Sequence, residues 1–284
     1  MAVIDGKALA TEIKQNLKKS VEEFETRYGR KIALAVILVG ENPASCVYVN
    51  NKVKAAEFVG IKSLSFRLPE TASEQDVASV IKSLSEDKSI DGILVQLPLP
   101  KHINEEKILS LVPPEKDVDG FTAENVGNTT LFKDSINSCT PAGIIYMLKS
   151  IGVPLCGKHA VIIGRSNIVG KPVALLLLKE NCTITVCHSK TENLHEITKQ
   201  ADILIAAIGK PKFVKYDMVK EGAIVIDVGI NRTDAGLCGD VDFDGVKDKA
   251  AYISPVPGGV GPMTIAMLMQ NVYKCALRRE NARL

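Results

Sequence analysis

The stretch AVIIGRSNIVGKPVALLLLK, residues 160–179, decides how this chain folds. Its first four residues are an uninterrupted apolar run, which predicts a buried strand, and residues 169–179 have the apolar spacing of a helix. Gly164 and Gly170 lie in the turn between the two. A strand, a glycine turn and a helix in this order present backbone N–H groups and the positive end of a helix dipole to a phosphate. The stretch therefore predicts a nucleotide-binding α/β fold.

The spacing of these glycines is not G-x-G-x-x-G, so a purely structural turn remains an alternative. The end of the next predicted strand discriminates between the two readings. An NAD site carries Asp or Glu there to hold the ribose 2′-hydroxyl, whereas residues 187–190 read CHSK. With Arg165 in the adjacent turn, cationic and hydroxyl donors would favour a 2′-phosphate. The sequence therefore predicts NADP as the cofactor.

Outward from this stretch, predicted strands and helices alternate. The strands are residues 32–39, 64–68, 92–97, 183–187, 203–207 and 223–228. The helices are residues 9–24, 43–59, 73–85, 194–199 and 262–279. Thr140 and Pro141 also predict the N-cap and first turn of a helix that reaches about Ile151. Near-continuous apolar strands separated by amphipathic helices indicate parallel sheets covered on both faces.

A chain of 284 residues is long enough for two domains or for one large α/β barrel. The irregular stretch VPPEKDVDGF, residues 112–121, ends the first series of strands, and a second series begins at Lys158. We therefore expect two α/β domains with a boundary near residues 140–157. Residues 1–140 would form an N-terminal domain with a parallel sheet, and residues 141–261 a Rossmann-like, NADP-binding domain.

Composition disfavours several classes of function. The net charge of +2 arises from 35 basic and 33 acidic side chains that are interspersed, and the aromatic content is 5% with no Trp, so nucleic-acid binding is disfavoured. The start, MAVIDGKALA, lacks the features of a signal peptide. The longest aliphatic run, residues 173–178, is far shorter than the roughly 20 residues of a membrane span. We expect a cytoplasmic protein that has no membrane partner.

The cysteines and histidines predict no metal site. The seven cysteines never form C-x-x-C, and most lie in apolar segments, which indicates free, buried thiols. The four histidines have no metal-ligand spacing with one another or with these cysteines.

The loop PVPGGVGPMT, residues 255–264, has the composition of a ligand-site wall. Proline fixes φ, while Gly258 and Gly259 can adopt positive φ and let the main chain approach a flat ligand closely. Pro262 lies where a helix would begin, because that position loses nothing by lacking an N–H. A tight structural turn is the alternative interpretation.

Tyr48 and Lys52 are four residues apart on a predicted helix, so their side chains share one face. A solvated lysine beside a half-buried tyrosine is the alternative. Tyr-x-x-x-Lys is also the catalytic pair of short-chain dehydrogenases, but in that family it follows an N-terminal glycine-rich loop. Here the glycine turn comes more than a hundred residues later, which argues against that family.

Polar residues also follow the strand at residues 92–97. Gln96 emerges at its end, before Leu97 and Pro98, at the sheet edge where open α/β sheets bind ligands. A buried structural amide is the alternative. Asp117 and Asp119 lie in the next loop, where a carboxylate could accept hydrogen bonds from the N–H edge of a ligand or simply form a turn.

Together these segments resemble the bifunctional methylenetetrahydrofolate dehydrogenase/methenyltetrahydrofolate cyclohydrolase family. The resemblance covers nearly the whole chain. The motifs occur in this order: ASCVYVNNKVKAAEFVGI, DGILVQLPLP, PEKDVDGF, CTPAGI, GRSNIVGKP, CHSKT, VIDVGIN, GDVDF and PVPGGVGPMT. Departures are small: NVGNTTLFKD lacks the expected glycine and leucine pattern, and Ser254 stands where Thr is usual.

The resemblance implies a role for each matching residue. The catalytic residues would be Lys52, Tyr48, Gln96 and Asp119: Tyr48 stacks on the folate, Lys52 is the acid/base group, Gln96 contacts Lys52, and Asp119 binds the pterin. Leu97, Pro98 and the loop residues Pro257, Gly258 and Gly259 would line the substrate site. The cofactor would contact Gly164, Arg165, Ser166, Ser189 and Ile230.

The resemblance also implies an architecture and a reaction. Two α/β domains flank a cleft, a C-terminal helix at residues 262–284 returns to the N-terminal domain, and the molecule is a homodimer. NADP would oxidise 5,10-methylenetetrahydrofolate, and hydrolysis would then give 10-formyltetrahydrofolate. An oxidoreductase of another substrate class, such as a shikimate-type dehydrogenase, and a non-catalytic nucleotide sensor are the alternatives.

Overall fold

The computed structural model describes residues 2–234 and 236–282. These residues form two compact units. Unit 1 consists of residues 2–10 and 138–264, and unit 2 of residues 11–137 and 265–282. Both are α/β with parallel sheets, as expected from the sequence.

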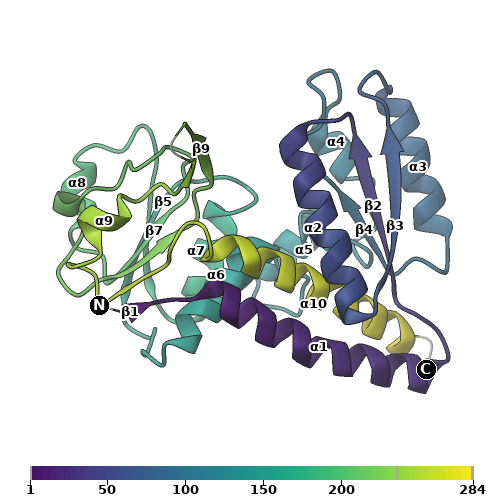
Figure 1. The fold of residues 1–284 in the computed structure, drawn as a ribbon, viewed down its shortest axis with the longest axis horizontal. Helices are drawn as coiled ribbons and strands as arrows, with labels where there is room; N and C mark the ends of the chain where they lie inside the picture. The colour runs from purple at the N-terminus through teal and green to yellow at the C-terminus, as the bar shows by residue number, and fades with distance from the viewer. Residues whose placement is uncertain (1, 235, 283–284) are drawn as a thin grey trace. The chain divides into compact units, whose positions relative to one another are not determined.

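The described part of unit 1 contains a six-stranded parallel sheet in the order β1-β11-β8-β7-β5-β6 (Figure 1). Its strands are β1 (Ala2–Val3), β5 (His159–Ile163), β6 (Thr183–Cys187), β7 (Ile203–Ala206), β8 (Ile224–Asp227) and β11 (Tyr252–Ile253). The chain order reverses direction between β5 and β7, which is the topology of a doubly wound, Rossmann-like sheet. Strands β5, β7 and β8 are almost fully buried, which explains their uninterrupted apolar sequences.

Unit 2 contains a parallel sheet in the order β3-β2-β4. The strands are β2 (Ala33–Val39), β3 (Lys62–Leu68) and β4 (Gly92–Val95). Residue Asp117 extends this sheet through a parallel bridge to Ile93. The sheet packs its apolar face against α3 (Glu74–Glu86), whose buried Val77, Ile81 and Leu84 are spaced at helical intervals.

The remaining elements connect these strands. The helices are α1 (Gly6–Tyr28), α2 (Pro43–Val59), α4 (Glu105–Leu109), α5 (Ala123–Thr130), α6 (Cys139–Ser150), α7 (Gly170–Lys179), α8 (Leu194–Thr198), α9 (Phe243–Val246) and α10 (Val260–Asn281). A 3₁₀ turn covers Tyr216–Met218, and β9 (Asn231–Thr233) pairs with β10 (Gly236–Cys238) as a hairpin.

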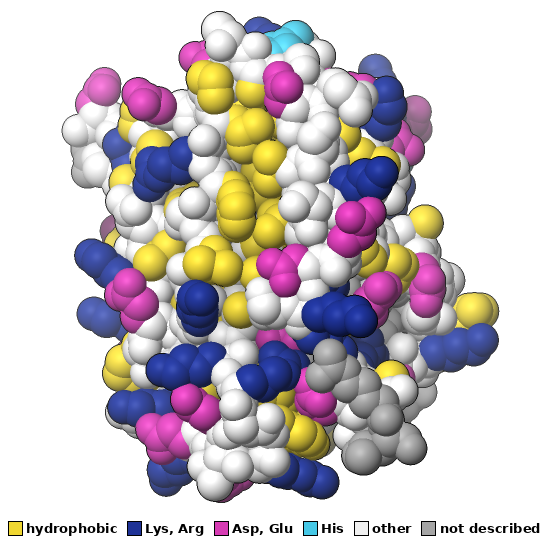
Figure 2. Space-filling view, turned by 90° about the vertical axis from the view of Figure 1, so that its right-hand side faces the viewer, with side chains coloured by type: hydrophobic (Ala, Val, Ile, Leu, Met, Phe, Trp, Pro, Cys, Tyr) yellow, Lys and Arg dark blue, Asp and Glu magenta, His cyan; other side chains and the backbone are white. Residues whose placement is uncertain are grey.

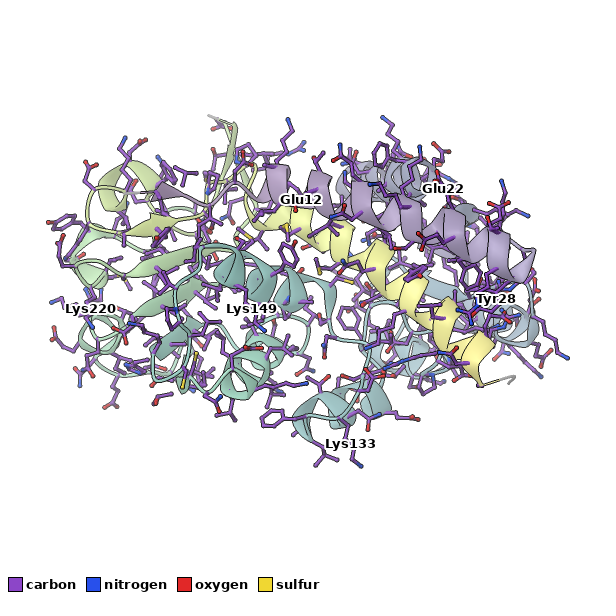
Figure 3. All side chains as sticks on the ribbon, turned by 90° about the horizontal axis from the view of Figure 1, so that it is seen from below. Glu12, Glu22, Tyr28, Lys133, Lys149 and Lys220 are labelled. Atoms are coloured by element: carbon purple, nitrogen blue, oxygen red, sulfur yellow. The ribbon has the colours of Figure 1, made fainter. Side chains whose placement is uncertain are left out.

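The last helix belongs to unit 2 from residue 265 onward. There α10 lies beside α1 (Figures 1 and 3), and the rings of Tyr273 and Phe24 meet with centroids 6.3 Å apart. Tyr28, labelled in Figure 3, ends α1, and its ring packs at a tilt of 48° against that of Phe24, with 4.7 Å between centroids. Tertiary packing therefore sets α10 against α1 in unit 2.

Several boundaries differ from the sequence prediction. Helix α6 begins at Cys139 and not after Thr140, whose hydroxyl instead hydrogen-bonds that of Thr264 at 2.9 Å. Helix α10 begins two residues before Pro262, which still lies within the first turn, where a missing N–H costs nothing. Residues 2–10 belong to unit 1, whereas the sequence placed them in the N-terminal domain, because β1 pairs with β11.

The cysteines are free in the described residues. Burial raises the pKa of the Cys182 thiol to about 11 and that of Cys275 to about 12, so both are poor nucleophiles. Cys139 and Cys187 are also buried, so most of the cysteines are buried as expected. Cys156 is exposed.

Charges of both signs alternate over the face drawn in Figure 2. This agrees with the near balance of basic and acidic residues in the sequence. No helix in the described part of the chain has both the length and the apolar character needed to cross a membrane.

Candidate active site

Most of the predicted ligand-contacting residues of unit 1 follow the carboxyl ends of its strands. Gly164, Arg165 and Ser166 follow β5, and Ser189 follows β6. Ile230 follows β8. Because the strands are parallel, these ends share one edge of the sheet, and the order reverses there between β5 and β7. Open α/β sheets bind ligands at such a switch point.

The glycine turn after β5 is packed too tightly for side chains. A Cβ at Gly164 would overlap the carbonyl oxygen of Ala207, and a Cβ at Gly170 would overlap that of Gly164. Gly164 also has a φ of +121°, a conformation that L side chains rarely adopt. The two glycines therefore let the start of α7 approach the ends of β5 and β7 closely.

The backbone at the start of α7 differs from the expectation of free N–H groups. The N–H groups of Val169 and Gly170 donate to Ser166 Oγ at 3.1 and 3.3 Å, and that of Lys171 donates to the Ser166 carbonyl at 3.1 Å. Ser166 thus provides acceptors for three backbone donors at the start of α7, whose N-cap is Val169. Its hydroxyl accepts these bonds, so its own proton can still be donated to a phosphate.

Arg165 and Ser189 are both exposed at this edge. The pairing of Ile163 with Cys187 places the ends of β5 and β6 next to each other. The backbone N–H of His188 donates to Thr191 Oγ1 at 2.8 Å, which shapes the loop that carries Ser189. A guanidinium and a hydroxyl with no carboxylate at the end of β6 form a donor set that fits a 2′-phosphate.

The loop after β11 lies beside these segments in unit 1. Gly258 has a φ of +106°, and its carbonyl accepts the N–H of Lys7 at 2.9 Å. The peptide bond before Pro257 is cis. The exposed side chain of Ile230 reaches to within 3.5 Å of the position that a Cβ on Gly261 would occupy. The structure therefore brings Ile230 and the glycine loop together.

In unit 2, Lys52 and Gln96 meet at the other switch point, between β2 and β4. Lys52 Nζ donates to Gln96 Oε1 at 2.9 Å. Gln96 is buried, its N–H donates to the Ile37 carbonyl at 2.9 Å, and its Nε2 donates to the Leu97 carbonyl at 2.6 Å. The amide is therefore fixed by the sheet and orients the amine.

Tyr48 lies one turn before Lys52 on α2 and is 37% exposed. Leu97 is half-buried and Pro98 is exposed, and the peptide bond between them is cis. These side chains lie next to the Lys52–Gln96 pair in sequence and are accessible to a ligand. A flat ring stacked on a tyrosine would use such an exposed aromatic face.

Asp117 and Asp119 have different environments. Asp117 is buried, and its oxygens accept the N–H groups of Gly120 at 2.9 Å and Thr122 at 2.8 Å and the Asn125 amide at 3.0 Å. Its carboxylate therefore shapes the loop, which agrees with the turn-forming alternative.

Asp119 is half-buried in the same loop. Burial raises the pKa of Asp119 to about 6, the charge of Lys52 opposes this rise, and the charge of Asp117 adds to it. A carboxyl group that is perturbed in this way at the edge of a sheet is a candidate for ligand contact.

Two further carboxylates, Asp227 and Asp240, were missed by the sequence reasoning. Asp240 accepts backbone N–H groups from the loop after β7, and Asp227 accepts those around Asp240. The sequence does contain a pattern that could have indicated them: each Asp lies close to a glycine, Gly229 or Gly239, and close backbone approach to a carboxylate requires glycine.

In the described residues, no group of His, Cys, Asp or Glu is placed to hold a metal ion.

Comparison with known protein families identifies the family of this chain. Residues 4–119 match the catalytic domain of tetrahydrofolate dehydrogenase/cyclohydrolase, and residues 138–280 match its NAD(P)-binding domain. The chain belongs to this family. The predicted family, fold class and enzyme class and the NADP cofactor are thereby confirmed. The proposal of an oxidoreductase for another substrate class and that of a nucleotide sensor are both rejected.

Individual relatives agree with the family match. The bifunctional protein FolD of Agathobacter rectalis is 55% identical over 277 residues, which cover 97% of this chain and 99% of that protein. The crystal structure of the bifunctional FolD enzyme from Campylobacter jejuni has 50% identity and a TM-score of 0.96, covering 98% of this chain and 99% of that one. A FolD structure from Trypanosoma brucei, complexed with NADP and an inhibitor, has 39% identity and a TM-score of 0.94, covering 98% of each chain.

Proposed function

We propose that Lys52 is the acid/base group of the cyclohydrolase step of this bifunctional enzyme. The observation that carries the proposal is the 2.9 Å hydrogen bond from Lys52 Nζ to Gln96 Oε1 at the switch point of the unit 2 sheet. Gln96 is a neutral acceptor, so it orients the amine without adding a charge that would hold the proton there.

The two reactions make different demands on the chain. Bound NADP supplies the hydride acceptor for oxidation of 5,10-methylenetetrahydrofolate, and this step needs alignment more than a proton carrier because the flanking nitrogens stabilise the cation. Hydrolysis of the 5,10-methenyl cation needs proton transfers. Neutral Lys52 would take a proton from the water that adds to the cationic carbon.

The ammonium of Lys52 would then return that proton to the ring nitrogen whose C–N bond breaks. The hydroxyl on the former methenyl carbon becomes the formyl carbonyl and releases its proton to solvent. The balance is one cation and one water consumed, and one 10-formyltetrahydrofolate and one proton formed. Lys52 ends the cycle in its starting state, as a general acid/base must.

The remaining residues of unit 2 support binding in this proposal. The exposed ring of Tyr48 would stack on the pteridine. The carboxylate of Asp119 would accept N–H groups of the pterin. Leu97 and Pro98 would contact the same ligand.

The assignments in unit 1 rest on the sheet edge described above. We propose that Gly164, Arg165, Ser166, Ser189 and Ile230 contact NADP, with Arg165 and Ser189 on the 2′-phosphate. The loop residues Pro257, Gly258 and Gly259 would contact the folate. Unit 1 would thus act as the NADP-binding domain, and unit 2 as the folate-binding and catalytic domain.

Replacing Lys52→Met tests the central proposal. Loss of a positioned acid/base group lowers a rate by about 10²- to 10⁴-fold, so hydrolysis of methenyltetrahydrofolate should fall by that factor. The matched control is Lys54→Met, an exposed lysine on the same helix, which should hydrolyse the cation at the wild-type rate. Wild-type hydrolysis by the Lys52 variant would show that the proposed role is wrong.

We also propose that the enzyme is a cytoplasmic homodimer, an expectation carried by the family resemblance. The protomer has a mass of 30.6 kDa. Sedimentation equilibrium at micromolar concentration should give twice this mass. A single species at the protomer mass would contradict the dimer.

A further inference from the structure

The carboxylate of Asp240 connects two loops at the edge of the unit 1 sheet. Asp240 is fully buried. Its Oδ2 accepts the N–H groups of Ile208 at 2.7 Å and Gly209 at 2.9 Å, and its Oδ1 accepts that of Lys210 at 2.8 Å. Oδ1 also accepts the Asn231 side-chain amide at 2.9 Å. One side chain therefore fixes the loop after β7 and the segment after β8.

Asp227, at the end of β8, fixes Asp240 in turn. Asp227 Oδ1 accepts the N–H groups of Asp240 at 2.8 Å and Gly229 at 3.0 Å, and its Oδ2 accepts that of Val241 at 2.9 Å. Burial raises the pKa of Asp227 to about 6, and these backbone hydrogen bonds oppose the rise. The two carboxylates form a chain of hydrogen bonds from the core of the sheet to its carboxyl edge.

Glycines allow this close approach. A Cβ at Gly229 would overlap the Asp240 carboxylate, and a Cβ at Gly239 would overlap that of Asp227. The loop held by Asp240 also continues directly from Ala207, whose carbonyl oxygen packs against Gly164 in the turn after β5. The position of the β7 loop is therefore coupled to the glycine turn at the switch point.

We infer that Asp240 is a positioning residue for NADP binding: by holding residues 208–210 and Asn231 it sets the backbone surface on which the coenzyme lies. The inference rests on the proposed NADP contacts in unit 1. It concerns residues outside those contacts, because buried Asp240 is not itself accessible to a coenzyme. Pre-ordering a binding surface lowers the entropy that a ligand must otherwise remove.

Asp240→Asn tests the inference with little change in shape. An amide NH₂ must replace one carboxylate oxygen, and it would then face either the N–H groups of Ile208 and Gly209 or that of Lys210 and the Asn231 amide. In either orientation the NH₂ group faces N–H donors, so one side of residue 240 loses its hydrogen bonds to the neighbouring loop. We expect calorimetry to show NADP binding at least tenfold weaker, and hydrogen exchange of the 208–210 amides to accelerate.

The matched control is Asp202→Asn at the opposite edge of the same sheet. Asp202 accepts the His159 N–H at 2.9 Å and pairs with Lys220, labelled in Figure 3, at 2.6 Å. Asp202 therefore also binds a backbone N–H and a side chain, but it lies before β7, away from the carboxyl ends of the strands. Its variant should bind NADP as the wild type does.

The bifunctional chemistry separates positioning from a general structural loss. Hydrolysis of methenyltetrahydrofolate without NADP should stay within about twofold of wild type in Asp240→Asn. Unchanged NADP binding, or an equal fall in hydrolysis, would overturn the inference.

If Asp240→Asn does not fold, NADP binding is measured instead with the milder Asn231→Ala, which removes only the side-chain amide that donates to Asp240. Weaker NADP binding by that variant supports the inference, and unchanged binding refutes it. If the wild type itself bound no NADP, the proposed function would fail instead.

Discussion

The amine of Lys52 is paired with an amide and not with a carboxylate, which is compatible with its proposed role as an acid/base group. A carboxylate partner would stabilise the ammonium and make the neutral amine scarce. The Oε1 of Gln96 accepts a hydrogen bond from the Lys52 nitrogen whether that nitrogen is neutral or protonated. The nitrogen can therefore keep its position during both proton transfers. The negative charge nearby comes from Asp119, whose own proton affinity is raised by burial.

Arg165→Ala should weaken NADP binding by about 10- to 100-fold, because a hydrogen bond to a charged group contributes about 1.5–3 kcal/mol. Binding of NAD should change little, since NAD lacks the 2′-phosphate. Dissociation constants for both coenzymes, measured by calorimetry, provide the check. Lys179→Ala removes a positive charge from the far end of α7 and serves as the control. Equal losses for both coenzymes would disprove the role of Arg165.

Asp119→Asn should alter stability in a pH-dependent way. Burial raises the pKa of Asp119 from 3.8 to about 6, so its contribution to folding stability is full below about pH 4 and is lost as the pH rises through about 6. Asn does not titrate, so the variant does not lose stability in this way. Its thermal stability relative to wild type should therefore increase between about pH 5 and about pH 8. Glu115→Gln, exposed in the same loop, is the control. A stability difference that does not change with pH would contradict this account.

At the scale of elements, capping decides where helices begin. Ser73 caps α3 in a capping box: its Oγ accepts the Asp76 N–H at 3.2 Å, and Asp76 Oδ2 accepts the Ser73 N–H at 2.9 Å. The sequence prediction placed this helix start correctly. At α6, the helix begins two residues earlier than a cap at Thr140 predicts, and the Thr140 hydroxyl instead bonds that of Thr264, a partner distant in sequence. Local caps are thus readable from sequence, whereas tertiary hydrogen bonds shift them.

Ser73→Ala should lower the free energy of unfolding by about 1 kcal/mol, because the Asp76 N–H loses its acceptor and Asp76 Oδ2 loses the hydroxyl that donates to it. Ser79→Ala on the same helix is the control, since its hydroxyl only bonds the Gln75 carbonyl within the helix. Urea denaturation of both variants measures the difference. Equal effects of the two substitutions would show that the cap contributes nothing specific.

At the scale of the whole molecule, charged residues from distant parts of the chain meet in unit 2. Asp91 is fully buried and accepts both terminal nitrogens of Arg30 at 2.8 Å, and Arg279 Nη1 at 2.9 Å. Its Oδ2 also accepts the Ala33 N–H at 3.0 Å, and Arg30 pairs with Glu280 at 2.7 Å. This cluster joins the start of β2, the start of β4 and the last helix.

Asp91→Ala should destabilise the protein by about 3–5 kcal/mol, because it removes the buried carboxylate that the partly buried guanidinium groups of Arg30 and Arg279 share. Asp134→Ala is the control: Asp134 pairs with Lys274 and Arg278 on the same last helix, but its side chain is 73% exposed. Such a surface pair contributes about 0–1 kcal/mol. Urea denaturation compares the two, and similar losses would show that burial of the Asp91 cluster does not matter.

The sequence by itself determined the α/β class and most strands and helices, and it supplied the residues proposed for the site. It could do so because apolar periodicity, glycine turns and caps are local features, and because motifs kept their order along the chain. Gln96 was predictable in this way, since its position at the end of an apolar strand places it at the carboxyl edge.

The tertiary structure alone decided which of these residues act together. The Lys52–Gln96 bond joins residues 44 positions apart, and Asp240 reaches a loop some 30 residues away, so neither contact has a local signature. The placement of β1 beside β11 and the bonding of Asp117 within its own loop were likewise set by sheet pairing and by the need of buried polar groups for partners. Such contacts depend on which strands become neighbours, and pairing of strands is a property of the folded chain.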